Sequence, residues 1–245
     1  WIKYCIDIRK KYPILINSQI NQKKYINSYF FISKLSEYLN SNSQVITDMG
    51  LSFVGTHQAF KVKTNQILFT NSGHAPMGWG LPASVGAYYA NKNKITVCLT
   101  GEGGIMMNIQ ELSTIMHNKI PIKIFIYNNG GYLTIKQTQQ LGFNSRIMGA
   151  DKNSGISFPN FKKLAESYSI KYYNFDHNSQ ISKTNLDKII KSPFPTICEL
   201  FIDPEQEQIP KAINKRDKNG KTVPTSFENL YPFLDEEEIK ASLNI

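Results

Sequence analysis

Short apolar runs alternate with amphipathic segments along most of the chain. Apolar runs bounded by turn residues are typical of buried strands, and apolar residues three or four positions apart are typical of helices. The first pattern predicts strands at residues 45–47, 66–70, 96–99, 122–127, 170–173 and 196–202. The second pattern predicts helices at residues 28–39, 52–60, 80–90, 108–117, 133–140, 161–168 and 185–191.

This alternation predicts the fold class. Strands separated by helices form βαβ units, so we expect a doubly wound α/β fold with a mostly parallel sheet and helices on both faces. The runs 95–99 and 122–127 are almost continuously apolar, as central strands covered on both faces should be. Ligands bind at the carboxyl ends of the strands in such sheets, so the residues that follow these two runs are the first candidates for function.

The two ends of the chain differ from its middle. Residues 1–11 have apolar side chains at helical spacing, and the stretch 17–24 is polar. Residues 209–226 are polar and interrupted by proline and glycine, which predicts an irregular arm, and 235–243 reads as a short acidic helix. We therefore expect three parts, namely a lead-in from an upstream domain at 1–26, the α/β domain at 27–205, and a C-terminal arm with a short helix at 206–245.

Composition narrows the class of protein. The 245 residues suffice for one large domain, and the apolar and charged fractions, 41% and 19%, are those of an ordinary globular protein. No apolar run reaches the roughly 18–20 residues that span a bilayer, so we expect no membrane association. The three cysteines are far apart and form no CxxC pair. We expect free thiols in a reducing compartment and a cytoplasmic protein.

The net charge of +9 raises the question of nucleic acid. The lysines are scattered along the chain, however, and no zinc-ligand spacing or RNA-binding aromatic signature accompanies them. We interpret the charge as a solvated basic surface that also suits anionic small molecules, and we expect no nucleic-acid partner.

Glycine-rich turns follow the two central strands. The first strand leads into Gly101-Glu102-Gly103-Gly104, and the second into Asn128-Asn129-Gly130-Gly131-Tyr132. Glycine lets backbone N–H groups approach a phosphate closely, and a carboxylate and an amide oxygen can share a hard divalent cation. Neighbouring parallel strands lie about 5 Å apart, so both turns can reach one cation. The pattern predicts a diphosphate held through a metal; the alternative is a pair of tight turns without a ligand.

The two turns and their spacing resemble the signature of thiamine-diphosphate enzymes, in which Gly-Asp-Gly is followed about two dozen residues later by Asn-Asn. The segments 108–112 and 121–124 between them resemble acetolactate synthases, and the resemblance extends over about 28–205. It implies the C-terminal, diphosphate-binding domain of such an enzyme, with thiamine diphosphate and Mg²⁺ as cofactors. It also implies Gly103 and Gly104 at the cofactor, and three metal ligands: the Glu102 carboxylate, the Asn129 amide oxygen and the Gly131 carbonyl.

Two upstream segments extend the resemblance. The stretch 72–82 matches the family segment in which a large apolar residue, here Met77, bends the cofactor, while the Ala75 carbonyl accepts a hydrogen bond from its amino group. The stretch 48–58 matches the segment at the diphosphate, which implies phosphate contacts for Thr56 and His57. From residue type alone, a core methionine is the commoner interpretation of Met77, and a surface or core histidine is the commoner interpretation of His57.

The sequence also departs from the family. Glu102 stands where the family has Asp and is one methylene longer. Thr134 and Thr138 replace the Met and Trp that line the acetolactate-synthase pocket, and Ile135 and Lys136 occupy the region of the catalytic Glu of pyruvate-decarboxylase-like enzymes. These differences leave the second substrate open.

The resemblance implies decarboxylation of a 2-oxo acid such as pyruvate, followed by carboligation. We expect no catalytic residue in this chain, because the family's activating Glu belongs to a pyrimidine-binding domain that these residues do not contain. That domain would come from the same or a partner chain, in a homodimer or tetramer, and the isolated chain would be inactive. The alternatives are a 2-oxo acid decarboxylase, or a split subunit of one, and a degenerate, non-catalytic domain.

Overall fold

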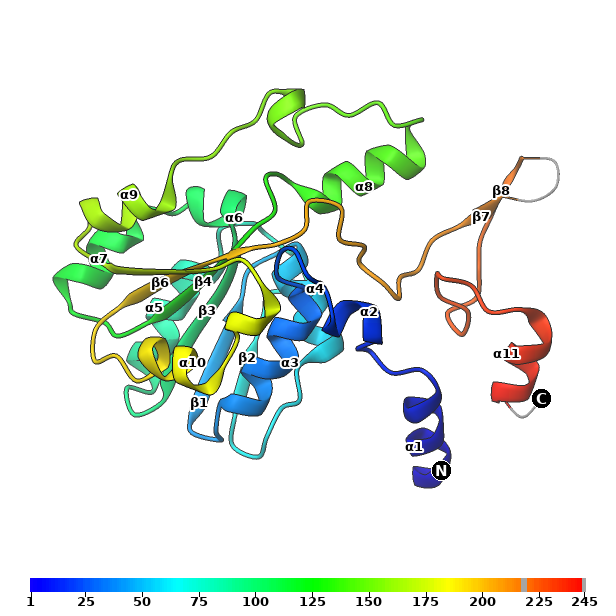
Figure 1. Cartoon of the computed structure of the whole chain (residues 1–245), viewed down its shortest axis with the longest axis horizontal. Coiled ribbons are helices and arrows are strands. Elements are labelled where there is room, and N and C mark those ends of the chain that lie inside the picture. Colours follow the sequence, from blue (N-terminus) through cyan, green and yellow to red (C-terminus); the bar gives the residue numbers. More distant parts are fainter. Residues whose placement is uncertain (217–219, 244–245) are drawn as a thin grey trace. The chain divides into compact units, whose positions relative to one another are not determined.

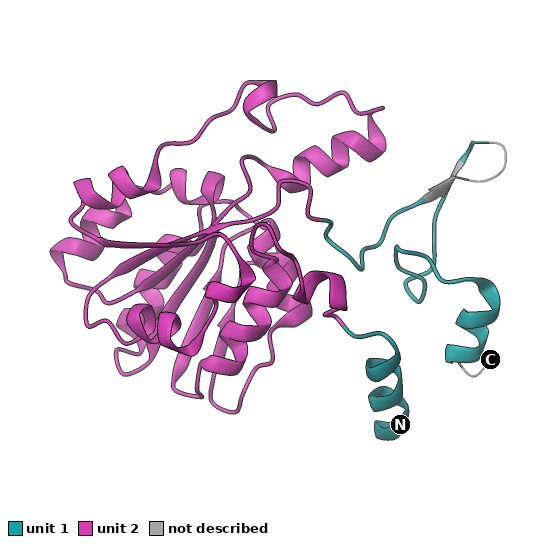
Figure 2. Ribbon diagram, in the orientation of Figure 1, with its two compact units in different colours: residues 1–13, 207–245 teal, residues 14–206 magenta. Residues whose placement is uncertain are grey.

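A computed structural model describes residues 1–216 and 220–243 of the chain. These residues form two compact units (Figure 2), one made of residues 14–206 and the other of residues 1–13 together with 207–245. The predicted lead-in at 1–26 contributes to both units, since its residues 14–26 group with the larger one. None of the helices in the described part of the chain has both the length and the apolar character needed to span a bilayer.

The larger unit is built on one six-stranded sheet (Figure 1) in which every neighbouring pair is parallel. The strands are β1 (Ser43–Thr47), β2 (Ile67–Phe69), β3 (Ile95–Gly101), β4 (Lys123–Asn128), β5 (Lys171–Phe175) and β6 (Thr196–Phe201). Their order across the sheet is β2-β1-β3-β4-β6-β5, so the two most apolar runs of the sequence are the central strands β3 and β4. The predicted α/β class and the predicted central strands are confirmed.

Helices cover both faces of this sheet. Side chains alternate along each strand: on β4, Phe125 and Tyr127 join one apolar core, and Ile124 and Ile126 join the other. The first core also contains residues of α3 (Ser28–Tyr38), α4 (Leu51–Ala59) and α10 (Lys183–Ile190). The second contains residues of α5 (Gly80–Ala90), α6 (Glu102–Met106), α7 (Glu111–His117) and α9 (Phe161–Ser167). The fold is therefore doubly wound, as predicted.

A side chain just before α3 fixes where this helix begins. The Asn27 side chain accepts hydrogen bonds from the N–H groups of Tyr29 and Phe30 and thereby caps α3. Just before it, Ile26 is fully buried and pairs with Ile202 after β6. The remaining elements of this unit are α2 (Asn17–Ile20), α8 (Leu133–Gly142) and two single-turn 3₁₀ helices, Lys152–Ser154 and Asn178–Gln180.

Three differences from the sequence prediction concern the site and the C-terminal arm. The glycine turn after β3 is itself the start of a short helix, α6, which was not predicted. Helix α7 begins at Glu111 instead of 108, because the Asn108 side chain donates to the Gly78 carbonyl at 2.8 Å and takes part in a turn. The predicted irregular arm contains a short antiparallel ribbon, β7 (Lys215–Arg216) with β8 (Thr222–Val223). Residues 217–219 and 244–245 of the predicted arm and tail lie outside the described residues.

The smaller unit joins the two ends of the chain. Helix α1 (Ile2–Lys11) lies against α11 (Glu236–Leu243), which the sequence predicted as an acidic helix. The Tyr4 hydroxyl donates to the Ser242 carbonyl at 2.6 Å, the Tyr12 hydroxyl donates to Glu238 at 2.8 Å, and Lys11 pairs with the same carboxylate at 3.2 Å. Polar contacts therefore link two helices that are more than 200 residues apart in sequence.

Candidate functional site

The carboxyl ends of β3 and β4 bring the two glycine-rich turns together. Gly101 is the last residue of β3 and is paired with Tyr127 near the end of β4. Helix α6 then starts at Glu102, while the loop from Asn129 leads into α8. Because the strands are neighbours and parallel, both turns emerge at the same edge of the sheet.

Glu102 and Asn129 meet at one backbone N–H group. Glu102 is buried, and its Oε1 accepts hydrogen bonds from the N–H groups of Asn129 at 3.0 Å and Gly131 at 2.8 Å. The Asn129 side-chain oxygen, Oδ1, accepts from the same Gly131 N–H at 3.2 Å. A carboxylate oxygen and an amide oxygen thus lie beside each other. The hydrogen bonds from Asn129 and Gly131 both go to Oε1 and not to the second carboxylate oxygen, Oε2.

Burial raises the pKa of Glu102 to about 7, because the surrounding protein solvates its charge poorly. Backbone N–H groups, including those of Asn129 and Gly131, lower the pKa but only partly offset this effect. The carboxyl group is therefore poised between its neutral and ionised forms near neutral pH. A cation beside it would stabilise the ionised form.

The glycines of the site are required by close packing. A Cβ on Gly103 would lie 2.0 Å from Cε1 of Tyr132, and a Cβ on Gly104 would lie 2.3 Å from Oδ2 of Asp48. On Gly131 it would lie 2.2 Å from the backbone oxygen of Ala150. Any larger residue at these positions would push the turns apart.

Asp48 ties the end of β1 to the same edge of the sheet. Its buried carboxylate accepts from the Gly78 N–H at 2.9 Å and from the Thr100 hydroxyl at 2.8 Å. Desolvation raises its pKa, while these donors and the N–H groups of Met49 and Gly80 lower it. The carboxylate therefore holds the loop before α5, which carries Met77, against the end of β3.

A small cavity of about 70 Å³ lies at this edge, between α4, α6 and α8. Six of the nine residues that the sequence assigned to the cofactor or the metal line it, namely Met77, Glu102, Gly103, Gly104, Asn129 and Gly131. Further wall residues come from the starts of two helices, namely Gly50, Leu51 and Ser52 at the start of α4 and Leu133, Thr134 and Ile135 in the first turn of α8.

Other predicted residues do not line this cavity. The buried Thr56 hydroxyl donates to the Ser52 carbonyl of its own helix at 2.5 Å. His57 is exposed, with Nδ1 3.0 Å from the Phe53 carbonyl oxygen. Ala75 adopts a left-handed conformation, φ 52°, in the loop before Met77, and Thr138 lies exposed on α8. The assignments of Thr56, His57 and Ala75 to the cofactor stay predictions.

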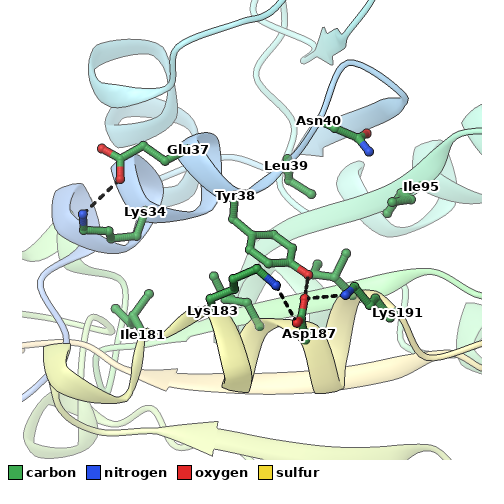
Figure 3. A pocket seen from close by; sticks show the side chains of 12 residues that line it. Lys34, Glu37, Tyr38, Leu39, Asn40, Ile95, Ile181, Lys183, Asp187 and Lys191 are labelled. Atoms are coloured by element: carbon green, nitrogen blue, oxygen red, sulfur yellow. Dashed lines mark hydrogen bonds and ion pairs between the residues drawn. The ribbon is translucent and has the colours of Figure 1, made fainter.

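A larger cavity, about 530 Å³, lies between α3 and α10 (Figure 3). It is near the amino ends of β1 and β3, opposite to the edge where parallel sheets bind ligands. Its polar groups already satisfy one another: Asp187 accepts from the Tyr38 hydroxyl and pairs with Lys183 at 2.9 Å and Lys191 at 3.1 Å. The smaller cavity is therefore the candidate functional site.

The doubly wound sheet and the paired turns at its carboxyl edge define a thiamine-diphosphate-binding domain. The protein-family model for the C-terminal thiamine-pyrophosphate-binding domain of thiamine pyrophosphate enzymes matches residues 48–200. The chain belongs to this family. It is related to acetolactate synthases, at about 30% identity.

Three large subunits of acetolactate synthase illustrate this similarity. The chain is 27% identical over 210 residues to isozyme 1 of Escherichia coli, a match that covers 86% of this chain and 36% of that protein. It is 32% identical over 202 residues to the protein of Porphyra purpurea (82% and 33%) and 30% identical over 212 residues to that of Lactococcus lactis (86% and 35%). The chain thus spans about a third of the length of these relatives.

The residues at the site fit the family's cofactor. The Glu102 carboxylate and the Asn129 side-chain amide oxygen lie side by side in the cavity wall, and oxygen ligands of this kind are those that Mg²⁺ prefers. The described residues contain no group of three or more His, Cys, Asp or Glu side chains able to hold a metal. A single carboxylate suffices, however, where an amide, a carbonyl and phosphate oxygens complete the coordination.

Sequence reasoning missed three residues that shape the site. Tyr132 was noted only as part of the motif, although its ring packs on Gly103. Asp48 was assigned no role of its own. Glu199 of β6 was also missed, and its signal was a charged residue within the apolar strand Thr196–Phe201.

Proposed function

We propose that this chain holds the diphosphate and Mg²⁺ in an enzyme that decarboxylates a 2-oxo acid such as pyruvate and joins the remaining fragment to a second carbonyl compound. The observation that carries the proposal is the convergence of Glu102 and Asn129 on the Gly131 N–H, at the carboxyl edge of the sheet. Thiamine diphosphate, when bound, supplies the electron sink for decarboxylation.

The roles of the chain's own residues follow from their chemistry. The Glu102 carboxylate, the Asn129 amide oxygen and the Gly131 carbonyl would hold Mg²⁺, and the start of α6 at Gly103 and Gly104 would lie against the diphosphate. Met77, in the cavity wall, would support the rings of the cofactor. Thr56, His57 and Ala75 would contact the cofactor from beyond this cavity, and the Thr56 hydroxyl would then exchange the Ser52 carbonyl for a phosphate oxygen.

This chain would form only part of the active site. A cavity of about 70 Å³ is far below the roughly 300 Å³ of a typical ligand pocket, which supports a second wall from another domain. We propose that a pyrimidine-binding domain, in the same or a partner polypeptide, supplies the activating Glu in a homodimer or tetramer. The cysteines are free, which suits a reducing, cytoplasmic location.

Calorimetric titration of the 245-residue chain with thiamine diphosphate tests the binding role. We expect weak binding with Mg²⁺, none with EDTA, and none for Asn129→Ala with Mg²⁺. Asn118→Ala is the control, because this exposed amide donates to the Thr114 carbonyl of its own helix and does not line the cavity. Absence of binding to the wild type, together with binding to Glu102→Asp, would instead favour a degenerate domain.

Product analysis tests the reaction. Co-expression with a pyrimidine-binding domain, followed by incubation with pyruvate, should give a longer keto acid by carboligation. Thr134 in the cavity wall and Thr138 on the same helix, which replace the Met and Trp of acetolactate synthases, keep a decarboxylase as the second candidate, and an aldehyde as the sole product would favour it. Robust turnover by the isolated chain would contradict the need for a second domain.

A further inference from the structure

Glu199 is a buried acidic residue that the proposed metal site does not use. It lies on β6, and only 5% of its surface is exposed. A carboxylate in such a position requires hydrogen-bond donors, since burial of an unpaired charge is costly. Its donors come from the two strands that flank β6 in the sheet.

Each oxygen of this carboxylate accepts one strong hydrogen bond. Oε1 accepts from Nδ2 of Asn128, the last residue of β4, at 2.5 Å, and Oε2 accepts from the Tyr172 hydroxyl on β5 at 2.5 Å. Burial and the neighbouring carboxylate both raise the pKa of Tyr172, so its hydroxyl stays a donor. Three neighbouring strands are thus linked through one side chain.

Asn128 connects Glu199 to residues 129–131, which carry two of the proposed metal ligands and are called the metal-binding loop below. Its side-chain oxygen, Oδ1, accepts the Gly130 N–H at 3.1 Å, while its NH₂ group faces Glu199. A carboxylate can only accept and an N–H can only donate, so Glu199 fixes which way the Asn128 amide is turned. Gly130 has φ 78°, and it lies between Asn129 and Gly131, which hold the contacts of Glu102.

We propose that Glu199, supported by Tyr172, is a positioning residue for the metal-binding loop: it orients Asn128, whose amide oxygen then holds the Gly130 N–H and orders Asn129 and Gly131 toward Glu102. The inference rests on the proposed function for the identity of the metal, but the ordering of the loop can be measured without it. Partners of this kind, one step behind the ligands, typically change metal affinity about 10- to 100-fold.

An isosteric swap tests the polarity of the Asn128–Glu199 pair. Glu199→Gln provides a side chain that can either accept or donate, so it no longer fixes which way the Asn128 amide is turned, and Asn128→Asp sets two carboxylates against each other. The double variant restores a donor facing an acceptor, with the direction of the bond reversed. Glu166→Gln is the control, because Glu166 is an exposed acid on α9.

The first measurement is amide proton exchange of Gly130 and Gly131 by NMR, on the full chain without ligand. We expect exchange about 5- to 10-fold faster in each single variant, as befits one lost hydrogen bond, and recovery in the double variant. Tyr172→Phe should have a smaller effect in the same direction. Unchanged exchange in both single variants, or no recovery in the double variant, would overturn the proposal.

The second measurement is the Mg²⁺ concentration that half-saturates thiamine-diphosphate binding. It should rise about 10- to 100-fold in each single variant and return toward the wild-type value in the double variant, without change in Glu166→Gln. Equal Mg²⁺ dependence in wild type and single variants would overturn the proposal. If the wild type binds no cofactor, the proposed function fails, and the exchange pattern alone decides whether Glu199 orders the loop.

Discussion

The ring of Tyr132 occupies the space that a side chain at Gly103 would need. A Cβ on Gly103 would lie 2.0 Å from Cε1 of Tyr132, a distance that no relaxed pair of carbon atoms adopts. The contact joins the start of α6 to the loop after β4, the two segments that carry the proposed metal ligands. Packing between these residues therefore helps to set the geometry of the site.

Gly103→Ala should separate these two segments. The ring must move, so we expect a loss of about 1–3 kcal/mol in the free energy of unfolding and weaker thiamine-diphosphate binding. Gly101→Ala is the matched control for stability, because a Cβ on Gly101 meets nothing within 4 Å and its φ of −88° suits alanine. Urea unfolding and calorimetry measure both effects; equal stability of the two variants would contradict the packing argument.

Asp48→Ala should destabilise the carboxyl edge of the sheet. The change removes the acceptor of the Gly78 N–H and leaves that group unpaired in a buried position, at a cost of about 1–3 kcal/mol. Thr100→Val removes only the hydroxyl donor and should cost about 1 kcal/mol. Urea unfolding compares the two variants, and a larger loss for Thr100→Val would count against the role assigned to Asp48.

The stability of the metal-free chain should depend on pH through Glu102. Its pKa of about 7 lies above the ordinary value of 4.5, so the folded state retains a proton that the unfolded chain has released. The free energy of unfolding should therefore fall as pH rises from about 4.5 to about 7, by up to about 3 kcal/mol, and this contribution should level off above pH 7.

Glu102→Gln isolates this effect, because the amide oxygen can still accept from the N–H groups of Asn129 and Gly131. Unfolding in EDTA across this pH range should show the decline in the wild type and not in the variant. The same slope in both proteins would assign the pH dependence to other groups.

Lys123 should give the opposite slope at alkaline pH. This buried lysine donates to the carbonyl groups of Ser192 at 2.5 Å and Phe194 at 2.7 Å, and burial lowers its pKa to about 8 from 10.5. Between these values the unfolded chain binds the proton and the folded chain does not, so stability relative to Lys123→Met should rise with pH. Urea unfolding at several pH values measures this difference; a constant difference would contradict it.

Much of the fold could be predicted from the sequence because its signals are local. Apolar runs located all six parallel strands, and helical spacing located α5 at its observed bounds, Gly80–Ala90. Helix α6 was missed, since Gly103 and Gly104 favour a turn when considered alone, and only their packing against Tyr132 and Asp48 makes a short helix stable there.

Part of the candidate site could also be predicted, because the glycine-rich motifs are local sequence signals. Motif spacing identified Glu102 and Asn129, and the adjacency of β3 and β4 brings them together. Thr56 and His57 lie on the same helix as the cavity residues Gly50 to Ser52, but helix α4 directs the Thr56 hydroxyl to its own backbone. Sequence spacing does not reveal which way such a side chain is turned.

The sequence by itself determined the α/β class, the central strands and the cofactor motif, because periodicity and glycine placement act over a few neighbouring residues. Only the tertiary structure decided that Glu102 reaches the N–H groups of the next loop, that Asp48 anchors Gly78, and that Glu199 orients Asn128. These contacts join residues about 30 to 70 positions apart, and the order of the strands across the sheet, not their order along the chain, places such residues side by side.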